Sequence, residues 1–382
     1  MLSYILSNFP SLFPKIFCIS TLTWSIYVLL IEACYNQIII NKKSPLIGCL
    51  VGLIGIVLYL LAVYSYFKTL TGGGSPSDFK ELRIRDIDQL KLQSQRNQNQ
   101  DQNNQNHKST AEDDEEEEDN EDHQQIDEGD ALIANDEPPT DYVNFHILKP
   151  GVSPFRYCEK CRAWKPDRTH HCSTCNRCIL RMDHHCPWYA SCIGYHNQKF
   201  FIQNLAYVST FAGYCFIVSL CLLWKFFSDE SYNDSYLSLK LVFLFILGLA
   251  FSIAVGVFAL FSMWLVTKNI TTIEFQESRW IWGEKKNKFQ YEFDSNGKKK
   301  DIGNIFNIGF MKNWKSVMGP NIWYWILPLS FTSTDINSNC NGINFDIDDE
   351  VYEKWCYNIR LQEQLNQQLN DYRERLHNER FS

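Results

Sequence analysis

Four long apolar runs without a single Asp, Glu, Lys or Arg constrain the fold of this chain more than any other feature. They cover residues 16–31, 46–67, 202–224 and 241–266. About 20 such residues cross a bilayer as an α-helix, which satisfies its own backbone hydrogen bonds in lipid. The first run is short, but the uncharged segment before Lys15 can extend it. Because one soluble core could hardly hide four such runs, we expect a multi-pass α-helical membrane protein with four transmembrane helices.

The basic residues next to these runs predict the orientation in the membrane. Four spans put both tails and the segment 68–201 on one side. That side carries Lys15, Lys68, Lys80, Arg83, Lys199, Lys268 and Arg279 near the membrane, whereas the other side carries Lys42, Lys43, Lys225 and Lys240. Positive residues are enriched in short cytoplasmic loops. We therefore expect cytosolic tails, with the segment 68–201 in the cytosol.

Composition divides the chain further. Residues 93–106 are mostly Gln and Asn, and 112–137 contain fifteen acidic and no basic residues, a composition typical of a disordered linker. The chain carries −8 and this acidic segment −15, so the remainder carries +7, which suits anionic lipid headgroups or a phosphate-bearing cofactor. We expect five parts: an N-terminal tail with two helices (1–67), a cytosolic disordered linker (68–153), a Cys-rich zinc domain (154–201), two more helices (202–266) and a cytosolic C-terminal region (267–382).

Cysteines and histidines are concentrated between the second and third runs, where seven of the fourteen cysteines lie. The eleven candidate metal ligands there are Cys158, Cys161, His170, His171, Cys172, Cys175, Cys178, His184, His185, Cys186 and Cys192. Structural zinc takes four ligands, and Cys-x2-Cys pairs are its usual chelating unit. Two zinc ions would use eight ligands and leave three spare. Interleaved histidines and a cytosolic location argue against disulfides.

The stretch Asp183-His184-His185-Cys186-Pro187 predicts a nucleophile among the spare residues. Neighbouring histidines rarely point at one metal ion, so one member of each His-His pair is expected to be free. A carboxylate that orients an imidazole, and an imidazole that takes a thiol proton, together activate a cysteine. These residues favour Cys186 as a nucleophile over Cys186 as a metal ligand.

Several motifs resemble the DHHC protein S-acyltransferases, or palmitoyltransferases. The resemblance covers about fifty residues with fixed spacing. It rests on Cys158-x2-Cys161, Lys165-Pro166-x-Arg168, His171-Cys172-x2-Cys175-x2-Cys178, Asp183-His184-His185-Cys186-Pro187-Trp188, Cys192, Asn197 and Lys199-Phe200-Phe201. Thr271-Thr272-Ile273-Glu274 looks like the family's Thr-Thr-x-Glu motif, and 309–314 resemble its C-terminal motif. The family also has this domain between its second and third membrane helices.

The resemblance implies an assignment of ligands and roles. One structural zinc ion would be held by Cys158, Cys161, His171 and Cys178, and a second by Cys172, Cys175, His185 and Cys192. His170, His184 and Cys186 would then be spare. In the family reaction, Cys186 attacks the thioester of palmitoyl-CoA, His184 oriented by Asp183 acts as the base, and the acyl group passes from acyl-Cys186 to a protein cysteine in a ping-pong mechanism. We expect membrane-associated protein substrates and no nucleic-acid partner.

Further residues are expected to contact the acyl donor. The CoA phosphates have four basic candidates, Arg168, Arg177, Arg181 and Lys199. Phe211 lies roughly 15 Å beyond Phe201 along the third helix at 1.5 Å per residue. The resemblance implies that a bulky residue at this depth closes the acyl cavity, with a residue of the first helix near Trp24 as the alternative.

Two departures from the family pattern indicate a branch. Gly72-Gly73-Gly74-Ser75-Pro76 replaces a common Asp-Pro-Gly, and Ala190-Ser191 replaces a common Asn-Asn. The chain looks more like the fungal vacuole-membrane branch, whose members acylate an armadillo-repeat vacuolar protein. We expect the vacuole membrane, with the Golgi or endoplasmic reticulum membrane as alternatives.

Two other functions can be weighed against an acyltransferase. A membrane ubiquitin ligase of the zinc cross-brace type also combines spans with Cys-x2-Cys pairs, but it ends in a second such pair, where this chain has only Cys192. A catalytically inactive zinc scaffold would lack Cys186 or His184, and both are present.

Overall fold

The computed structural model describes residues 2–84, 139–147, 155–228, 237–280, 291–293, 298–330 and 341–381. They belong to two compact units, each assembled from segments that are distant in the sequence. The first unit comprises 1–73, 182–273 and 309–337, and the second comprises 74–181, 274–308 and 338–382. The Gln/Asn-rich and acidic parts of the expected linker, 93–106 and 112–137, lie outside the described residues.

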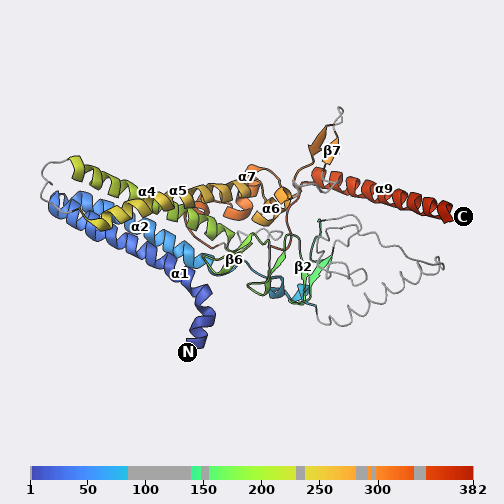
Figure 1. The fold of residues 1–382 in the computed structure, drawn as a ribbon, viewed down its shortest axis with the longest axis horizontal. Coiled ribbons are helices and arrows are strands. Elements are labelled where there is room, and N and C mark those ends of the chain that lie inside the picture. The colour runs from blue at the N-terminus through green and yellow to red at the C-terminus, as the bar shows by residue number, and fades with distance from the viewer. Residues whose placement is uncertain are drawn as a thin grey trace. The chain divides into compact units, whose positions relative to one another are not determined.

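Long apolar helices make up most of the first unit (Figure 1). They are α1 (Leu2–Val28) with its continuation η1 (Leu29–Asn41), α2 (Pro45–Thr69), α4 (Gln198–Ser228) and α5 (Leu239–Thr267). Four stretches within them are long and apolar enough to cross a membrane, namely Ser11–Asn41, Pro45–Thr69, Gln198–Ser228 and Leu239–Thr267. The prediction of four membrane helices is confirmed.

The first span extends beyond the expected run 16–31, because the helix continues as the π-helix η1 and so includes Glu32. A charge within a span is costly unless it is paired. Lys240, at the start of α5, donates to one oxygen of Glu32 at 2.8 Å, and Asn36 donates to the other at 3.2 Å. These contacts compensate the charge of Glu32 and join the first span to the last.

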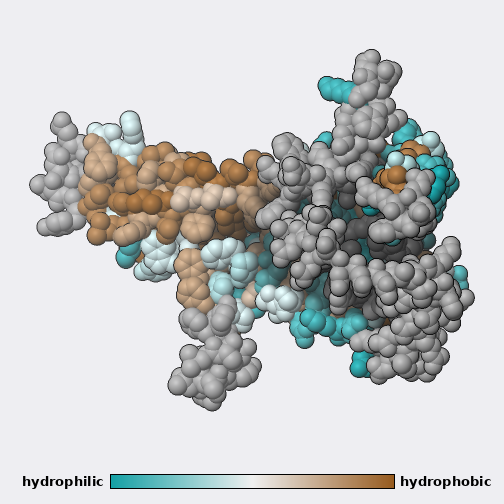
Figure 2. All heavy atoms as spheres, turned by 45° about the vertical axis from the view of Figure 1, so that its right-hand side comes forward, coloured by the Kyte–Doolittle hydropathy of each residue, from teal (hydrophilic) through white to brown (hydrophobic). Residues whose placement is uncertain are grey.

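Apolar packing and close backbone approach hold the helices together. Helix α4 packs against both α2 and α5. At Gly248 of α5, a Cβ atom would lie 2.8 Å from the backbone nitrogen of Phe216 on α4, so only glycine permits this approach. On the outside, Leu46 is 83% exposed and Leu260 is 68% exposed, and Figure 2 shows a continuous apolar surface over these helices. Such a surface suits contact with lipid tails.

The segment after α5 folds back onto the helices through α7 (Phe310–Met318) and α8 (Ile322–Ile326). Asn313 donates to the carbonyl of Thr267, the last residue of α5, at 2.9 Å. The side chain of Gln203 on α4 donates to the carbonyls of Tyr324, Trp325 and Leu327. The bonds to Tyr324 and Trp325 satisfy carbonyl groups that the last turn of α8 leaves without a helical partner.

Short antiparallel hairpins carry the Cys/His segment. In the second unit β1 (Arg156–Cys158) pairs with β2 (Ala163–Lys165), and β3 (His170–Cys172) pairs with β4 (Arg177–Ile179). In the first unit β5 (His184–Cys186) pairs with β6 (Ser191–Ile193). A further hairpin of the second unit joins β7 (Tyr291–Phe293) to β8 (Lys299–Asp301).

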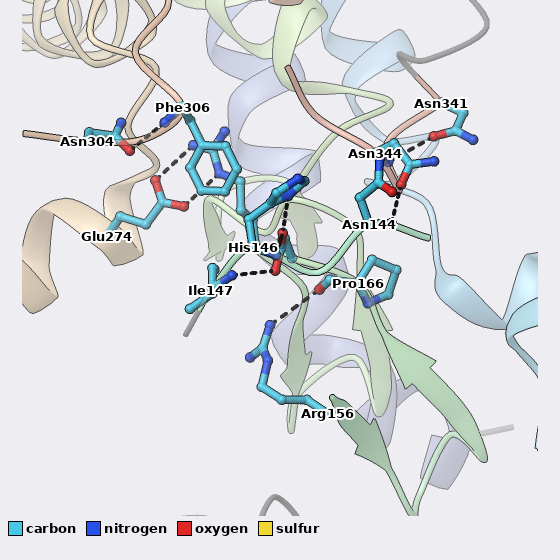
Figure 3. A network of polar contacts seen from close by, with 12 residues as sticks. Asn144, His146, Ile147, Arg156, Pro166, Glu274, Asn304, Phe306, Asn341 and Asn344 are labelled. Atoms are coloured by element: carbon cyan, nitrogen blue, oxygen red, sulfur yellow. Dashed lines mark hydrogen bonds and ion pairs between the residues drawn. The ribbon is translucent and has the colours of Figure 1, made fainter. Parts of the chain in front are cut away.

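Within the second unit, polar contacts connect segments that are distant in the sequence (Figure 3). The carboxylate of Asp167 accepts hydrogen bonds from the backbone N–H groups of His146 and Ile147, at 2.8 and 3.3 Å, and contacts the ring of His146 at 3.0 Å. The backbone of Asn144 donates to the side chain of Asn344 at 2.8 Å. Residues 139–147 of the expected linker thus belong to this unit, as does the other end, which contains η2 (Pro76–Asp78) and η3 (Lys80–Leu82).

The last helix, α9 (Asp349–Phe381), forms the C-terminal tail. Its first turns pack within the second unit, where the ring of Tyr352 lies 5.5 Å from that of His146. Beyond the buried residue Ile359, most of its described side chains are exposed.

Candidate active site

The first group of metal-ligand candidates lies within the second unit. Cys158, Cys161, His171 and Cys178 each offer one ligand atom, and the four atoms lie within 4.8 Å of one another. Cys158 ends β1, and the register of β3 and β4 places His171 directly opposite Cys178. These are the four residues that the family resemblance assigns to one metal ion.

The geometry of this group fits zinc. The Nδ1 atom of His171 lies 3.3 Å from the sulfur of Cys161, 3.5 Å from that of Cys158 and 3.8 Å from that of Cys178. Tetrahedral zinc, with bonds of about 2.3 Å to sulfur and 2.0 Å to nitrogen, places its ligand atoms about 3.5–3.8 Å apart. The Cys3His donor set is also typical of structural zinc.

The second group of candidates combines two pairs, Cys172 with Cys175 and His185 with Cys192. In one pair, the backbone N–H of Cys175 donates to the sulfur of Cys172 at 3.3 Å. In the other, His185 faces Cys192 across β5 and β6, with Nδ1 3.5 Å from the sulfur. The described residues thus hold two Cys/His groups that could bind metal ions, and neither group includes His170, His184 or Cys186.

Cys186 lies at the end of β5 in an apolar environment and is only 5% exposed. It belongs to a buried cluster that also contains Tyr189, Phe201 and Ile202, together with residues of α2, α5 and α7. Apolar side chains around a thiol exclude water and provide a surface for an acyl chain. Cys186 is therefore placed where the apolar helices meet the β5–β6 hairpin of the first unit.

Asp183 and His184 form a hydrogen-bonded pair beside Cys186. The Nδ1 atom of His184 lies 2.7 Å from Oδ2 of Asp183. Burial alone would lower the pKa of His184, but hydrogen bonds with Asp183 and with the Cys186 thiol raise this pKa to about 9. The imidazole is therefore a stronger base than an ordinary histidine and is suited to take a proton from a neighbouring thiol.

The carboxylate of Asp183 is held by donors from two further segments. Thr272, at the start of α6 (Thr272–Trp280), donates its backbone N–H to Oδ1 at 2.9 Å and its hydroxyl to Oδ2 at 2.8 Å. Gln198 donates to Oδ1 at 3.4 Å. Burial alone would raise the pKa of Asp183, but the bonds with His184 and Thr272 lower it. The carboxylate therefore stays ionised and fixes the imidazole.

The turn after Cys186 is anchored to the membrane helices. The hydroxyl of Tyr66 on α2 donates to the carbonyl of Trp188 at 3.1 Å, and that of Tyr189 donates to Asn204 on α4 at 2.5 Å. Asn204 in turn donates to the carbonyl of Ala62 and to Ser65 on α2. These anchors were not predicted from the sequence, although Asn204 offers one signal, because it is a polar residue within a membrane span.

The four basic residues expected at the CoA phosphates lie in different surroundings. Arg168 is 1% exposed and forms two bonds with Glu274, at 2.7 and 2.8 Å, with its guanidinium 4.5 Å from the ring of Phe306. Arg181 and Lys199 are buried, and Lys199 donates to the carbonyl of Leu329 at 2.7 Å. The side chain of Arg177 is 47% exposed. Of the four, Arg177 is the most accessible to a soluble cofactor.

Phe211 lies deep among the helices and is 2% exposed. It belongs to a second buried cluster with Leu29 and Cys215, and Trp24 packs against the same cluster. The ring of Phe211 lies 6.3 Å from that of Tyr59 on α2. Both residues considered for the end of an acyl cavity, Phe211 and Trp24, therefore contribute to one apolar layer.

These features define a multi-pass membrane enzyme that has a buried thiol paired with His and Asp and two Cys/His groups that could bind metal ions. A sequence profile described as DHHC palmitoyltransferase matches residues 152–279. The chain is 51% identical over 377 residues to the palmitoyltransferase PFA3 of Debaryomyces hansenii, covering 98% of this chain and 91% of that protein. It is 46% identical to PFA3 of Candida albicans (97% and 92% covered) and 31% identical to human palmitoyltransferase ZDHHC2 (83% and 71% covered).

The chain belongs to the DHHC palmitoyltransferase family. It is accordingly a multi-pass membrane protein with protein S-palmitoyltransferase activity. Family membership implies an acyl donor and protein substrates, and the two Cys/His groups fit the zinc-binding domain of the family. The predictions of family, fold class and enzyme class from the sequence are confirmed.

Proposed function

We propose that this enzyme transfers a palmitoyl group from palmitoyl-CoA to protein cysteines in two steps, through an acyl-Cys186 thioester. The observation that supports this most strongly is the arrangement of His184, which bonds to Asp183 at 2.7 Å and also interacts with the Cys186 thiol. A carboxylate that orients an imidazole beside a thiol is the arrangement expected of an activated nucleophile. Thr272 also donates to Asp183, from its backbone N–H and from its hydroxyl.

In the first step, the Cys186 thiolate attacks the carbonyl carbon of the palmitoyl thioester. The bond from that carbon to the CoA sulfur breaks, and the His184 imidazolium gives its proton to the leaving sulfur. Asp183 stabilises the imidazolium before the transfer and keeps the ring oriented after it. The products are acyl-Cys186, neutral His184 and free CoA.

In the second step, neutral His184 takes the proton from the thiol of a substrate cysteine. The resulting thiolate attacks the carbonyl of acyl-Cys186, and Cys186 leaves as a thiolate beside the protonated His184. The resting pair is restored without any other reagent. Between the two steps, the apolar cluster around Cys186 holds the palmitoyl chain. Its burial stabilises the acyl-enzyme by about 0.8 kcal/mol per buried methylene.

The metal groups and the donor contacts complete this proposal. Two structural zinc ions would be held by the two Cys/His groups and would fix the hairpins that present Asp183, His184 and Cys186. The CoA phosphates would meet basic residues, with Arg177 the most accessible, while Arg168 has its main contact with Glu274. Phe211 would close the end of the acyl cavity.

We further propose cytosolic tails, a cytosolic active site and the vacuole membrane as the location. The excess of basic residues beside the spans supports this orientation. The resemblance to the fungal vacuole-membrane branch supports the vacuole and, as substrate, an armadillo-repeat vacuolar protein, and the chain is similar to several yeast proteins named PFA3.

A chase experiment tests the two-step mechanism. Purified enzyme is loaded with labelled palmitoyl-CoA, freed of the remaining donor by gel filtration and then mixed with a substrate protein. We expect the label to leave Cys186 and appear on the substrate cysteine without new donor. Transfer that requires palmitoyl-CoA to be present together with the substrate would contradict the acyl-enzyme mechanism.

A further inference from the structure

Gln198, the first residue of α4, is buried where a carboxamide is costly. It is 4% exposed, and its Oε1 atom has no hydrogen-bond partner among the residues that the structure describes. A buried polar group without a partner destabilises a fold, and an apolar residue of the same size would avoid that cost. The hydrogen bond that the Gln198 side chain forms among the described residues therefore explains why a glutamine occupies this buried position.

That contact is with the carboxylate of Asp183. The Nε2 atom of Gln198 lies 3.4 Å from Oδ1, the same oxygen that accepts the backbone N–H of Thr272 at 2.9 Å. The other oxygen, Oδ2, accepts from His184 at 2.7 Å and from the Thr272 hydroxyl at 2.8 Å. Gln198 thus supplies the second donor on Oδ1, so that each oxygen of the carboxylate is held by two donors.

The position of Gln198 connects this carboxylate to a membrane helix. Within two turns after Gln198, α4 contributes Phe201, Ile202 and Leu205 to the buried cluster that contains Cys186. The ring of Phe201 also lies 5.3 Å from that of His184. One end of the helix therefore lines the surroundings of the nucleophile, while its first side chain bonds to the carboxylate that orients the base.

We propose that Gln198 is a positioning residue, which fixes Asp183 relative to α4 and so keeps His184 aligned with Cys186 when an acyl chain enters among the helices. The inference rests on the function proposed above. It predicts that Gln198 acts on the rate of the chemical step and has little effect on the binding of palmitoyl-CoA, because Gln198 donates to Asp183, which in turn contacts His184.

The test compares two substitutions at position 198 with one at a matched residue. Gln203 is also a buried glutamine of α4 with an unpartnered Oε1 among the described residues, but it donates to the carbonyls of 324, 325 and 327. Gln198→Met removes the donor, and Gln198→Glu replaces it with an acceptor whose charge repels Asp183. Gln203→Met makes the same chemical change one and a half turns along the helix.

Single-turnover loading of Cys186 is measured over a range of palmitoyl-CoA concentrations in detergent, with metal content and thermal unfolding recorded for each variant. For Gln198→Met we expect the maximal loading rate to fall about three- to tenfold at an unchanged half-saturating concentration, as loss of one hydrogen bond implies. For Gln198→Glu we expect a fall at least about tenfold greater, because a like charge is added. Gln203→Met should load at the wild-type rate.

Several results would overturn the inference. Wild-type loading rates in Gln198→Met, or an equal loss of rate in Gln203→Met, would show that Gln198 serves only packing. A raised half-saturating concentration at an unchanged maximal rate would assign Gln198 to donor binding. If Gln198→Glu fails to fold, Gln198→Met decides alone. A wild-type enzyme that takes up no acyl group would instead overturn the proposed function, and this inference with it.

Discussion

Thr272 donates two hydrogen bonds to Asp183, one from its backbone N–H at 2.9 Å and one from its hydroxyl at 2.8 Å. The two residues are 89 positions apart in the sequence. Asp183 precedes β5, which comes before α4 in the chain, and Thr272 begins α6, just after the last membrane helix α5. The contact therefore connects the segment before α4 with the segment after α5, at the carboxylate that orients His184.

Removal of the Thr272 hydroxyl should slow the loading of Cys186. Thr272→Val keeps the shape and the backbone donor but loses the bond to Oδ2, and we expect the loading rate to fall about three- to tenfold. Thr272→Ser retains a hydroxyl and should stay close to the wild type. Single-turnover loading with labelled palmitoyl-CoA measures both variants, and equal rates for Val and Ser would refute a role for the hydroxyl.

The two neighbouring histidines of β5 should separate in their effects on metal content. His185 belongs to the second metal group, whereas His184 bonds to Asp183. We expect His185→Ala to lose about one of two zinc ions and much of its thermal stability. His184→Ala should keep both ions and lose only acyl loading. Elemental analysis of the purified variants distinguishes the roles, and the opposite pattern would exchange them.

Ala190 adopts a backbone conformation that alanine disfavours. Its φ is +44°, in the left-handed region that Gly and Asn enter more readily. Many family members have Asn-Asn where this chain has Ala190-Ser191. Alanine at position 190 therefore lowers the stability of the fold relative to a residue that enters this region readily. We expect Ala190→Gly to raise the free energy of unfolding by about 0.5–1 kcal/mol. Thermal unfolding in detergent measures the change, and a lower midpoint than that of the wild type would contradict it.

Truncation of Phe211 should change the preferred chain length. Phe211 is 2% exposed and belongs to the second buried cluster, with Leu29 and Cys215. We expect Phe211→Ala to open space there and shift preference from sixteen-carbon to eighteen-carbon or longer acyl-CoA, with loading otherwise intact. The matched control is Phe227→Ala on the same helix, whose side chain is 74% exposed. Competition among acyl-CoAs of graded length gives the answer, and unchanged preferences in both variants would place the end of the cavity elsewhere.

Much of this fold could be predicted because its main determinants are local in the sequence. A charge-free run of membrane length predicts a span without knowledge of its neighbours, and Cys-x2-Cys spacing predicts a chelating turn. The site residues Asp183, His184 and Cys186 could be proposed for the same reason, since the pair and its nucleophile lie within four consecutive positions.

The contacts that could not be predicted join residues that are far apart in the sequence. Glu32 ends a charge-free run, yet it is accommodated within the first span because Lys240, 208 positions later, compensates its charge. The guanidinium of Arg168, a candidate for the CoA phosphates, donates to Glu274, 106 positions away. Gln198 and Thr272 show their contacts with Asp183 only once α4 and α6 are placed. No periodicity in the sequence reports such pairs.

The most direct test of the central claim is the mass of the intact protein after incubation with palmitoyl-CoA. We expect the wild-type enzyme to gain one palmitoyl group, peptide mapping to place it on Cys186, and neutral hydroxylamine to release it. Cys186→Ser should gain none, because an alcohol is a far weaker nucleophile than a thiolate at neutral pH. Palmitoyl labelling of Cys186→Ser at the wild-type level, or labelling of the wild type at other cysteines alone, would contradict the assignment of Cys186 as the nucleophile.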